Sequence, residues 1–203
     1  MIYVIGLTGG ISTGKTNISA ALKEIGAYVA DADEISHALT AKNGAALPAI
    51  RKAFGDKVFD GDTLNRRALG SIIFADEQSR ETLNNILHPM IFERIKEDIR
   101  HAEQKGFPAV ILDVPLLYET GYDKICHEIW VSYVPQKEQL KRLCERDGIT
   151  QKQALQKIRS QMPAIQKKRR ADRVINTSGT LEESAAIARK MYRETLEKIK
   201  HLS

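Results

Sequence analysis

The chain has 203 residues, of which 42% are hydrophobic and 28% are charged, and its formal net charge is +5 at pH 7. This length suffices for one sizeable core with insertions, and the composition is that of an ordinary globular protein. No apolar run approaches the roughly 18 residues that a membrane span needs, so we expect no membrane partner. The modest positive charge suits ligands that are polyanions.

The two cysteines, Cys126 and Cys144, have neither a metal-binding nor a disulfide spacing. We expect free thiols in a reducing compartment. Residues 1–8 are apolar but show no basic leader or cleavage site, so no signal peptide is expected. Together these features predict a cytoplasmic protein.

The first motif is a glycine-rich loop between a strand and a helix. Residues 2–7 are an apolar run typical of a buried strand, and they lead into Gly9-x-x-x-x-Gly14-Lys15-Thr16. Glycines let successive backbone N–H groups point at one phosphate, and the following helix adds its positive end. Lys15 supplies charge for the β- and γ-phosphates, and the Thr16 hydroxyl is placed to bind Mg²⁺. The sequence therefore predicts a nucleoside triphosphate site made by Gly10, Ile11, Ser12, Thr13, Gly14, Lys15 and Thr16.

Two carboxylates follow the next predicted strand, residues 27–33, which ends in Asp31 and Asp33. A strand, a helix and a strand within about 30 residues indicate a βαβ unit with parallel strands. Ligands of such folds lie beyond the carboxyl ends of the strands, so we expect one carboxylate to accept a substrate proton or to hold Mg²⁺ through water. The alternative is that Asp33 caps a helix that starts at Glu34.

A long helical insertion is predicted over residues 34–105, where apolar side chains recur every three or four positions. Breaks are predicted at Asn43-Gly44, Gly55-Asp56 and Gly61-Asp62. We expect it to carry a second substrate. Arg66 stands at a helix start and is either a ligand-binding residue or part of a solvated helix end. His88 precedes Pro89, where a helix break is expected, and is either functional or a surface or capping histidine.

Three further strands are predicted at residues 108–117, which end in a turn at Pro115, at 127–134 and at 173–176. A capping box at Thr180 and Glu183 predicts a last helix that runs to about Lys200, with Leu181 on its core-facing stripe. Continuous apolar runs suit a parallel sheet covered on both faces, so we predict an α/β fold with a parallel five-stranded sheet flanked by helices. Asp113 ends the apolar stretch of the third strand. A buried acid there needs a partner and is a candidate for holding Mg²⁺.

The segment 146–173 carries nine Lys or Arg residues and two Asp residues. A basic, mobile helical segment can close over polyphosphate and exclude water. Arg142, on the preceding helix, lies nearest to the end of a strand and is the stronger candidate for a phosphate ligand. For residues 167–170 we favour an ordinary solvated helix. The segment contains no aromatic residue for stacking, which argues against a nucleic-acid partner.

Across residues 2–200 the chain resembles the dephospho-CoA kinase family. The glycine-rich loop alone is shared with many families, and the combination of motifs is much more specific. The motifs that carry the resemblance are Gly6–Thr16, Asp31-Ala-Asp33, Arg66-Arg67 with Leu69 and Phe74, Leu87-His-Pro89, Val114–Glu119, Gln139–Leu143 with Arg146-Asp147, Gln161-Met-Pro163 and Ala171–Asn176.

The resemblance implies a single unit in three parts. These are a nucleotide-binding core (1–33, 106–142 and 173–203), a helical CoA-binding insertion (34–105) and a helical lid (143–172). It implies that ATP, with Mg²⁺, phosphorylates the ribose 3′-hydroxyl of dephospho-CoA to give coenzyme A and ADP. The alternative is another small-metabolite or nucleotide kinase on the same scaffold. We expect a small-molecule partner and a monomer or weak homo-oligomer.

The resemblance also implies roles for single residues. Asp33 takes the proton of the 3′-hydroxyl, and Lys15 and Arg142 stabilise the transferring phosphoryl group. Thr16 binds Mg²⁺. Further substrate contacts are implied for Thr8, Arg66 and His88 on the acceptor side and for Asn176 near the adenine of ATP.

Three positions bear on the family pattern. Ser12 stands where the family loop usually has its third glycine, so its side chain is expected to crowd the phosphate or to require a strained φ. Asn65 stands where an acid is common before Arg66, and Asp113 stands where the family varies. None of the three removes a group that the chemistry requires.

Overall fold

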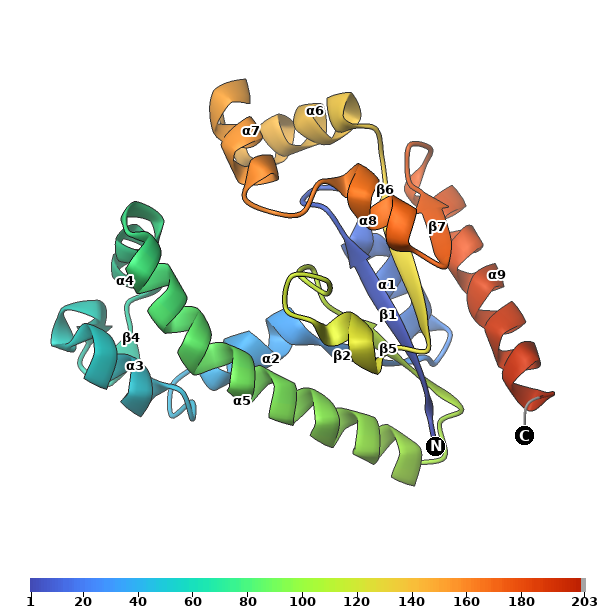
Figure 1. Ribbon diagram of the computed structural model, residues 1–203, viewed down its shortest axis with the longest axis horizontal. Coiled ribbons are helices and arrows are strands. Elements are labelled where there is room, and N and C mark those ends of the chain that lie inside the picture. Colours follow the sequence, from blue (N-terminus) through green and yellow to red (C-terminus); the bar gives the residue numbers. More distant parts are fainter. Residues whose placement is uncertain (202–203) are drawn as a thin grey trace. The chain divides into compact units, whose positions relative to one another are not determined.

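A computed structural model describes residues 1–201 of the chain (Figure 1). The chain divides into two compact units. The first consists of Met1–Ala30 and the chain from Ile99 onward, and the second of Asp31–Asp98. No helix within the described residues is long and apolar enough to cross a membrane.

A five-stranded parallel sheet forms the centre of the first unit. Its strands are β1 (Tyr3–Gly9), β2 (Tyr28–Asp31), β5 (Ala109–Asp113), β6 (Glu128–Tyr133) and β7 (Arg173–Asn176), in the order β2-β5-β1-β6-β7. β1 pairs in parallel with both β5 and β6, so the first strand of the chain becomes the central one. Ile5 and Leu7 on one face of β1 are completely buried, and Val4 and Thr8 on the other face are buried too, as expected for a strand covered on both faces.

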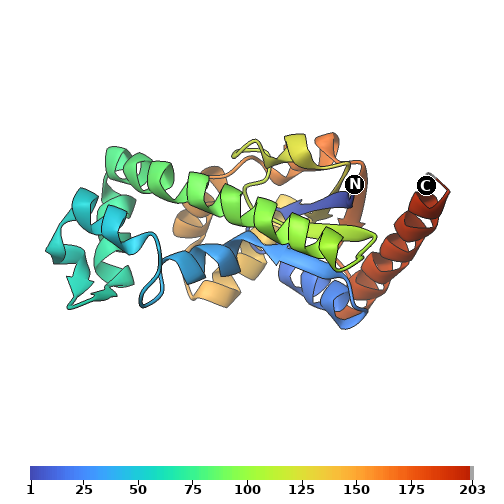
Figure 2. The same cartoon turned by 90° about the horizontal axis from the view of Figure 1, so that it is seen from below.

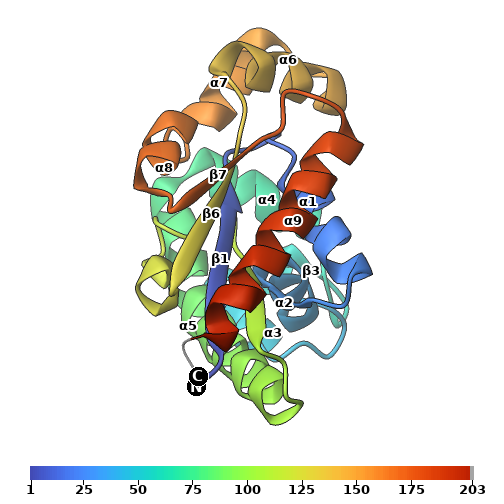
Figure 3. The same cartoon turned by 90° about the vertical axis from the view of Figure 1, so that its right-hand side faces the viewer.

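The helices of the first unit are α1 (Lys15–Glu24), α6 (Gln136–Asp147), α7 (Gln151–Arg159), α8 (Ala164–Arg170) and α9 (Leu181–Lys200), with a 3₁₀ turn η2 (Tyr122–Ile125). α1, α8 and α9 pack on the sheet, whereas α6 and α7 pack against each other. α1 and α9 lie side by side (Figure 3). Ile18 and Leu22 of α1 join Ala188 and Met191 of α9 in the main core. Thr180 and Glu183 form the predicted capping box at the start of α9.

The second unit is mainly helical. It contains α2 (Ala32–Leu39), α3 (Leu47–Phe54), a 3₁₀ turn η1 (Asp56–Val58), α4 (Arg66–Ala75) and α5 (Glu77–Gln104) as far as Asp98. A small antiparallel hairpin of β3 (Phe59–Asp60) and β4 (Thr63–Leu64) interrupts the helices. Its turn contains Gly61 at φ 61°, a left-handed conformation that glycine adopts without strain. The sequence pattern predicted a break here but no hairpin.

Several predicted boundaries were wrong. The second strand ends at Asp31, and Asp33 lies in the first turn of α2. The third strand ends at Asp113, and the predicted turn at Pro115 is present, so only the last residues of the predicted range lie outside the strand. Leu181, expected in the core, is 70% exposed because it occupies the first position of α9, beyond the sheet-facing stripe.

The predicted helix break at Pro89 was also wrong. α5 runs unbroken from Glu77 to Gln104 with Pro89 inside it (Figure 2). A proline removes one backbone hydrogen bond from a helix. The buried side chains of Leu83, Ile91 and Ile95, on either side of the proline, offset that loss.

Candidate active site

The predicted phosphate-binding loop joins the end of β1 to the start of α1. β1 ends at Gly9 and α1 begins at Lys15. A Cβ atom on Gly9 would lie 2.0 Å from Ser132 Oγ and 2.5 Å from Thr13 Oγ1, so this position requires glycine. A Cβ atom on Gly10 would lie 2.7 Å from Gln139 Nε2 and would displace the end of that side chain. Gly14 has φ 83° and precedes the helix. Ser12 has φ 58°, which confirms the strained φ that was expected if a side chain occupied this position.

Hydroxyl groups hold the second half of this loop. Thr13 Oγ1 donates a hydrogen bond to the Gly10 carbonyl (2.7 Å) and lies 2.7 Å from Ser132 Oγ on β6. Thr177 Oγ1, in the loop that follows β7, donates to the Thr13 carbonyl (2.7 Å). The loop is thus hydrogen-bonded to β6 and to the segment that follows β7, both of which come much later in the chain.

Ile11, in the turn of the loop, is half-buried, and both its backbone N–H and its carbonyl are hydrogen-bonded to side chains. Gln161 Oε1 accepts a hydrogen bond from the Ile11 N–H (3.0 Å), and Gln139 Nε2 donates to the Ile11 carbonyl (2.8 Å). The Ile11 side chain packs against a small core that includes Leu143 and Ile158. These contacts fix the backbone conformation of the loop at Ile11 without a bound ligand.

Lys15 and Asp113 form a close ion pair in the first unit. Lys15 follows β1, and Asp113 ends the neighbouring strand β5 and is 1% exposed. Asp113 was predicted to need a partner, and Lys15 is that partner. Within residues 1–201, no group of three or more His, Cys, Asp or Glu side chains is arranged to hold a metal ion. Thr16, the predicted Mg²⁺ ligand, is exposed in the first turn of α1.

Arg142 and Asn176 lie near the loop that follows β7. Arg142 Nη2 donates to the Thr177 carbonyl (2.8 Å), and Arg142 Nε pairs with Glu138 (2.8 Å). Asn176 is exposed, and its Oδ1 accepts a hydrogen bond from Ser178 N–H (3.0 Å). Thr177 therefore connects Arg142 to the glycine-rich loop.

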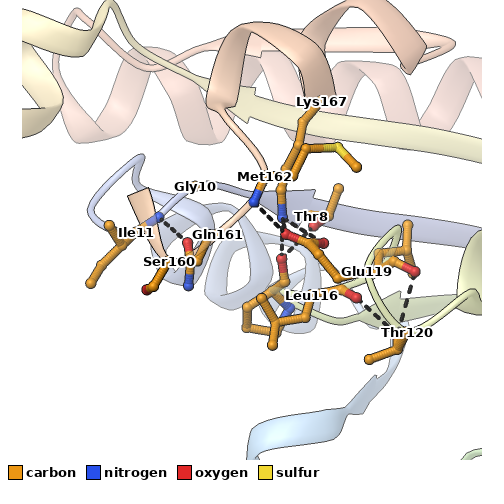
Figure 4. Close-up of polar contacts among 12 residues, drawn as sticks. Thr8, Gly10, Ile11, Leu116, Glu119, Thr120, Ser160, Gln161, Met162 and Lys167 are labelled. Atoms are coloured by element: carbon orange, nitrogen blue, oxygen red, sulfur yellow. Dashed lines mark hydrogen bonds and ion pairs between the residues drawn. The ribbon is translucent and has the colours of Figure 1, made fainter. Parts of the chain in front are cut away.

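Lys167 was expected on a solvated helix, but its side chain is completely buried. Its ammonium donates to the Pro115 carbonyl (2.6 Å) and pairs with Glu119 (3.0 Å) (Figure 4). Burial lowers the pKa of Lys167, and Glu119 opposes that shift. Nothing in the local basic run distinguishes Lys167 from its neighbours, because its partner lies 48 residues earlier in the chain.

The remaining predicted residues are distributed over both units. Thr8 is buried in β1 and donates its hydroxyl hydrogen to the Pro115 carbonyl (3.0 Å). Asp31, not Asp33, caps α2, because its carboxylate accepts from the N–H groups of Asp33 (2.9 Å) and Glu34 (3.2 Å). The suggestion that Asp33 is the cap was therefore wrong, and Asp33 stays a candidate base.

Arg66 and His88 belong to the second unit. Arg66 begins α4, which Asn65 caps by accepting from Ala68 N–H, and Arg66 Nη2 lies 3.4 Å from the His37 carbonyl oxygen. His88 is half-buried inside α5, and its burial lowers its pKa. The substrate-binding roles of both residues remain predictions.

The chain is similar to a well-defined group of proteins. The model of the family described as dephospho-CoA kinase matches residues 3–183. The dephospho-CoA kinase of Shouchella clausii is 42% identical over 181 residues, which cover 89% of this chain and 92% of that protein. The dephospho-CoA kinase of Enterococcus faecalis is 41% identical over 98% of this chain and the whole of that protein.

Solved structures show the same fold. The dephospho-CoA kinase from Campylobacter jejuni has a TM-score of 0.74 and 25% identity, and the alignment covers 98% of this chain and 99% of that one. The predicted α/β fold with a five-stranded parallel sheet flanked by helices is therefore confirmed.

Proposed function

This chain belongs to the dephospho-CoA kinase family, and we propose from that membership that it transfers the γ-phosphoryl group of ATP to the ribose 3′-hydroxyl of dephospho-CoA. The products are coenzyme A and ADP, the last step of coenzyme A biosynthesis. The main observation in support is the glycine-rich loop, which is held by hydrogen bonds from distant residues and ends at Lys15. The chain also matches this family over residues 3–183.

The loop from Gly10 to Thr16 binds the phosphates. Its backbone N–H groups and the N-terminus of α1 attract negative charge. Lys15 leaves or shares its ion pair with Asp113 when it contacts the β- and γ-phosphates. Arg142 adds a second positive charge on the same side, and the charge that develops during transfer is stabilised by both. Asn176 and its loop contact the adenine.

Thr16 is the residue that would hold Mg²⁺. Mg²⁺ takes oxygen ligands and keeps several waters, and it is commonly bound by few protein groups together with the substrate's phosphates. An exposed hydroxyl in the first turn of α1 fits this donor set. When bound, Mg²⁺ neutralises charge on the β- and γ-phosphates.

Asp33 is the proposed base. Its carboxylate accepts the proton of the ribose 3′-hydroxyl while the oxygen forms its bond to the γ-phosphorus and the bond to the leaving ADP oxygen breaks. Because Asp31 takes the capping role, the Asp33 carboxylate is not needed to cap the helix. Thr8, Arg66 and His88 shape the acceptor side.

Different parts of the chain bind the two substrates. We propose that residues 34–105 bind the CoA portion, and the compact unit Asp31–Asp98 supports an insertion of this size. Residues 143–172 form the lid over the nucleotide. The protein acts in the cytoplasm, without nucleic acid or membrane partners, as a monomer or weak homo-oligomer.

The test is to incubate the purified protein with ATP, Mg²⁺ and dephospho-CoA and to measure ADP and coenzyme A by mass spectrometry. We expect one coenzyme A for each ADP. ADP without coenzyme A, or phosphate transfer to a nucleoside monophosphate instead, would contradict the proposed acceptor. An omission of Mg²⁺ serves as the control for metal dependence.

A further inference from the structure

The starting point is the completely buried lysine of α8. The Lys167 ammonium contacts three oxygen atoms: the Pro115 carbonyl (2.6 Å) and both carboxylate oxygens of Glu119 (3.0 and 3.1 Å). Two of these contacts are hydrogen bonds, to the Pro115 carbonyl and to Glu119 Oε2, and the contact with Glu119 Oε1 is an ion pair. Because an isolated buried charge is very unfavourable, this pairing indicates a built interaction and not a chance surface contact.

Glu119 also reaches the segment that precedes α8. Its Oε1 accepts a hydrogen bond from the Met162 N–H (2.9 Å). One carboxylate thus holds both Met162 and Lys167, which flank the start of α8 (Figure 4). The segment 162–167 is fastened to the loop that follows β5.

Gln161, which directly precedes Met162, connects this segment to the phosphate-binding loop. The Gln161 side chain accepts from Ile11 N–H (3.0 Å), and both ends of this contact are drawn in Figure 4. Gln139 holds the carbonyl of Ile11. The position of Gln161 depends on Met162, and Met162 is held by the Glu119–Lys167 pair.

A second connection reaches the loop from the other side. The Pro115 carbonyl accepts from both Lys167 Nζ (2.6 Å) and Thr8 Oγ1 (3.0 Å). Thr8 lies in β1, directly before Gly9 and the loop. Lys167 is therefore linked to the strand that leads into the loop and, through Glu119 and Met162, to Gln161 at its turn.

We propose that Lys167 and Glu119 are positioning residues for nucleotide binding. Their ion pair holds Gln161 against Ile11 and so maintains the phosphate-binding loop in its binding conformation before the nucleotide arrives. A loop that is already ordered loses less conformational entropy on binding, which raises affinity. The inference rests on the proposed function and adds the residues that prepare its nucleotide site.

The first test measures ADP affinity by calorimetry and the KM values for ATP and dephospho-CoA. Lys167→Met keeps most of the side-chain volume but removes the ammonium. We expect the ADP Kd and the KM for ATP to rise about tenfold, the equivalent of one charge-assisted hydrogen bond. The KM for dephospho-CoA should stay the same. Lys190→Met, which removes an exposed lysine on α9, is the control for net charge.

A merely structural role would give a different result. If Lys167→Met lowers the thermal unfolding midpoint but binds ADP as tightly as Lys190→Met does, the inference is wrong. It is also wrong if the KM values of both substrates rise equally. Wild-type protein that binds ADP but forms no coenzyme A would overturn the proposed function, and the ADP affinities would still decide this inference.

Gln161→Ala tests the connection without leaving a charge unpaired in the interior. It removes the acceptor of the Ile11 N–H and should also weaken ADP binding, and it decides the matter if Lys167→Met does not fold. The double variant should bind ADP only slightly more weakly than either single variant, because both act through one connection. Additive losses, or normal ADP binding by Gln161→Ala, would overturn the proposal.

Discussion

The ammonium of Lys15 is paired with the carboxylate of Asp113, which ends the strand beside β1. The pair directs the lysine toward the sheet edge at which the glycine-rich loop begins. Since Asp113 is almost completely buried, its negative charge is screened little by water, and the lysine is held firmly. Nucleotide phosphates therefore compete with a buried carboxylate for this ammonium.

Replacing Lys15 with alanine should affect both binding and rate. The variant lacks the positive charge that we assign to the β- and γ-phosphates, so we expect turnover to fall by about 100-fold or more and ADP to bind more weakly. Lys23→Ala, at an exposed position of the same helix, is the control. Calorimetry with ADP and the coenzyme A assay measure the two effects. A loss of equal size in Lys23→Ala would show that general charge, not the position of Lys15, is responsible.

Replacing Asp33 with asparagine should leave nucleotide binding intact and abolish most turnover. The change removes the proton acceptor with little change in volume, and general-base catalysis is typically worth about 10²–10⁴-fold. ADP affinity and kcat are measured on the same preparation. Asp31→Asn is the matched variant, because asparagine also caps helices well and should retain most of the activity. If Asp31→Asn loses more turnover than Asp33→Asn, the base is Asp31.

Replacing Ser12 with glycine should stabilise the protein. Ser12 has φ 58°, a conformation that costs about 1–2 kcal/mol for a residue with a side chain, and its buried hydroxyl has no hydrogen-bond partner among the described residues. The greater freedom of glycine in the unfolded chain offsets part of the gain, so we expect about 0.5–1 kcal/mol in urea unfolding. Asn43→Gly, at φ 65°, should gain less because asparagine tolerates this region better. A destabilised Ser12→Gly would mean that the hydroxyl has a favourable contact.

Cys126 should react slowly with alkylating reagents. Burial raises its thiol pKa to about 12, and Asp123 and Asp172 add to the shift, so little thiolate exists at pH 8. Labelling of Cys126 by iodoacetamide, followed by peptide mass spectrometry, should be much slower in the folded protein than in urea. Equal rates would show that the thiol is not protected.

The same shift predicts a dependence of stability on pH. Above about pH 8.5 the unfolded chain loses a thiol proton that the folded protein retains, so the free energy of unfolding falls as pH rises. Cys126→Ala should remove this part of the decline between pH 8.5 and the highest pH that the fold tolerates. Urea unfolding at a series of pH values measures it. An unchanged slope in the variant would contradict the assignment.

The features that were predicted correctly are local in the sequence. The loop from Gly9 to Thr16, the capping box of Thr180 and Glu183, and the strand at 173–176 depend on residue types and spacings within a few positions. The strain at Ser12 could be anticipated for the same reason. Local propensity, however, predicted a break at Pro89, where the packing of a long helix prevailed.

The features that were missed depend on distant partners. Lys167 has the same local surroundings as the exposed lysine and arginines that follow it, and only its pairing with Glu119 accounts for its burial. The hydrogen bonds to the backbone of Ile11 come from the side chains of Gln139 and Gln161, which are more than a hundred residues away in the sequence. A single sequence contains no signal for such pairs. Asp31 caps α2 in place of Asp33, because β2 ends two residues before the predicted position and the helix begins correspondingly earlier.

The hydroxyl of Thr177 is bonded to the carbonyl of Thr13, and β1 lies between strands that are synthesised long after it. On the ribosome, where chains emerge from the N-terminus, the glycine-rich sequence appears first but its supports appear last. A nascent chain that has not yet reached Thr177 contains the whole loop sequence but not the finished loop. Until Thr177 is synthesised, the Thr13 carbonyl lacks the hydrogen bond that holds this part of the loop. A product truncated before residue 177 keeps the most recognisable motif of the protein and loses the contacts that shape it.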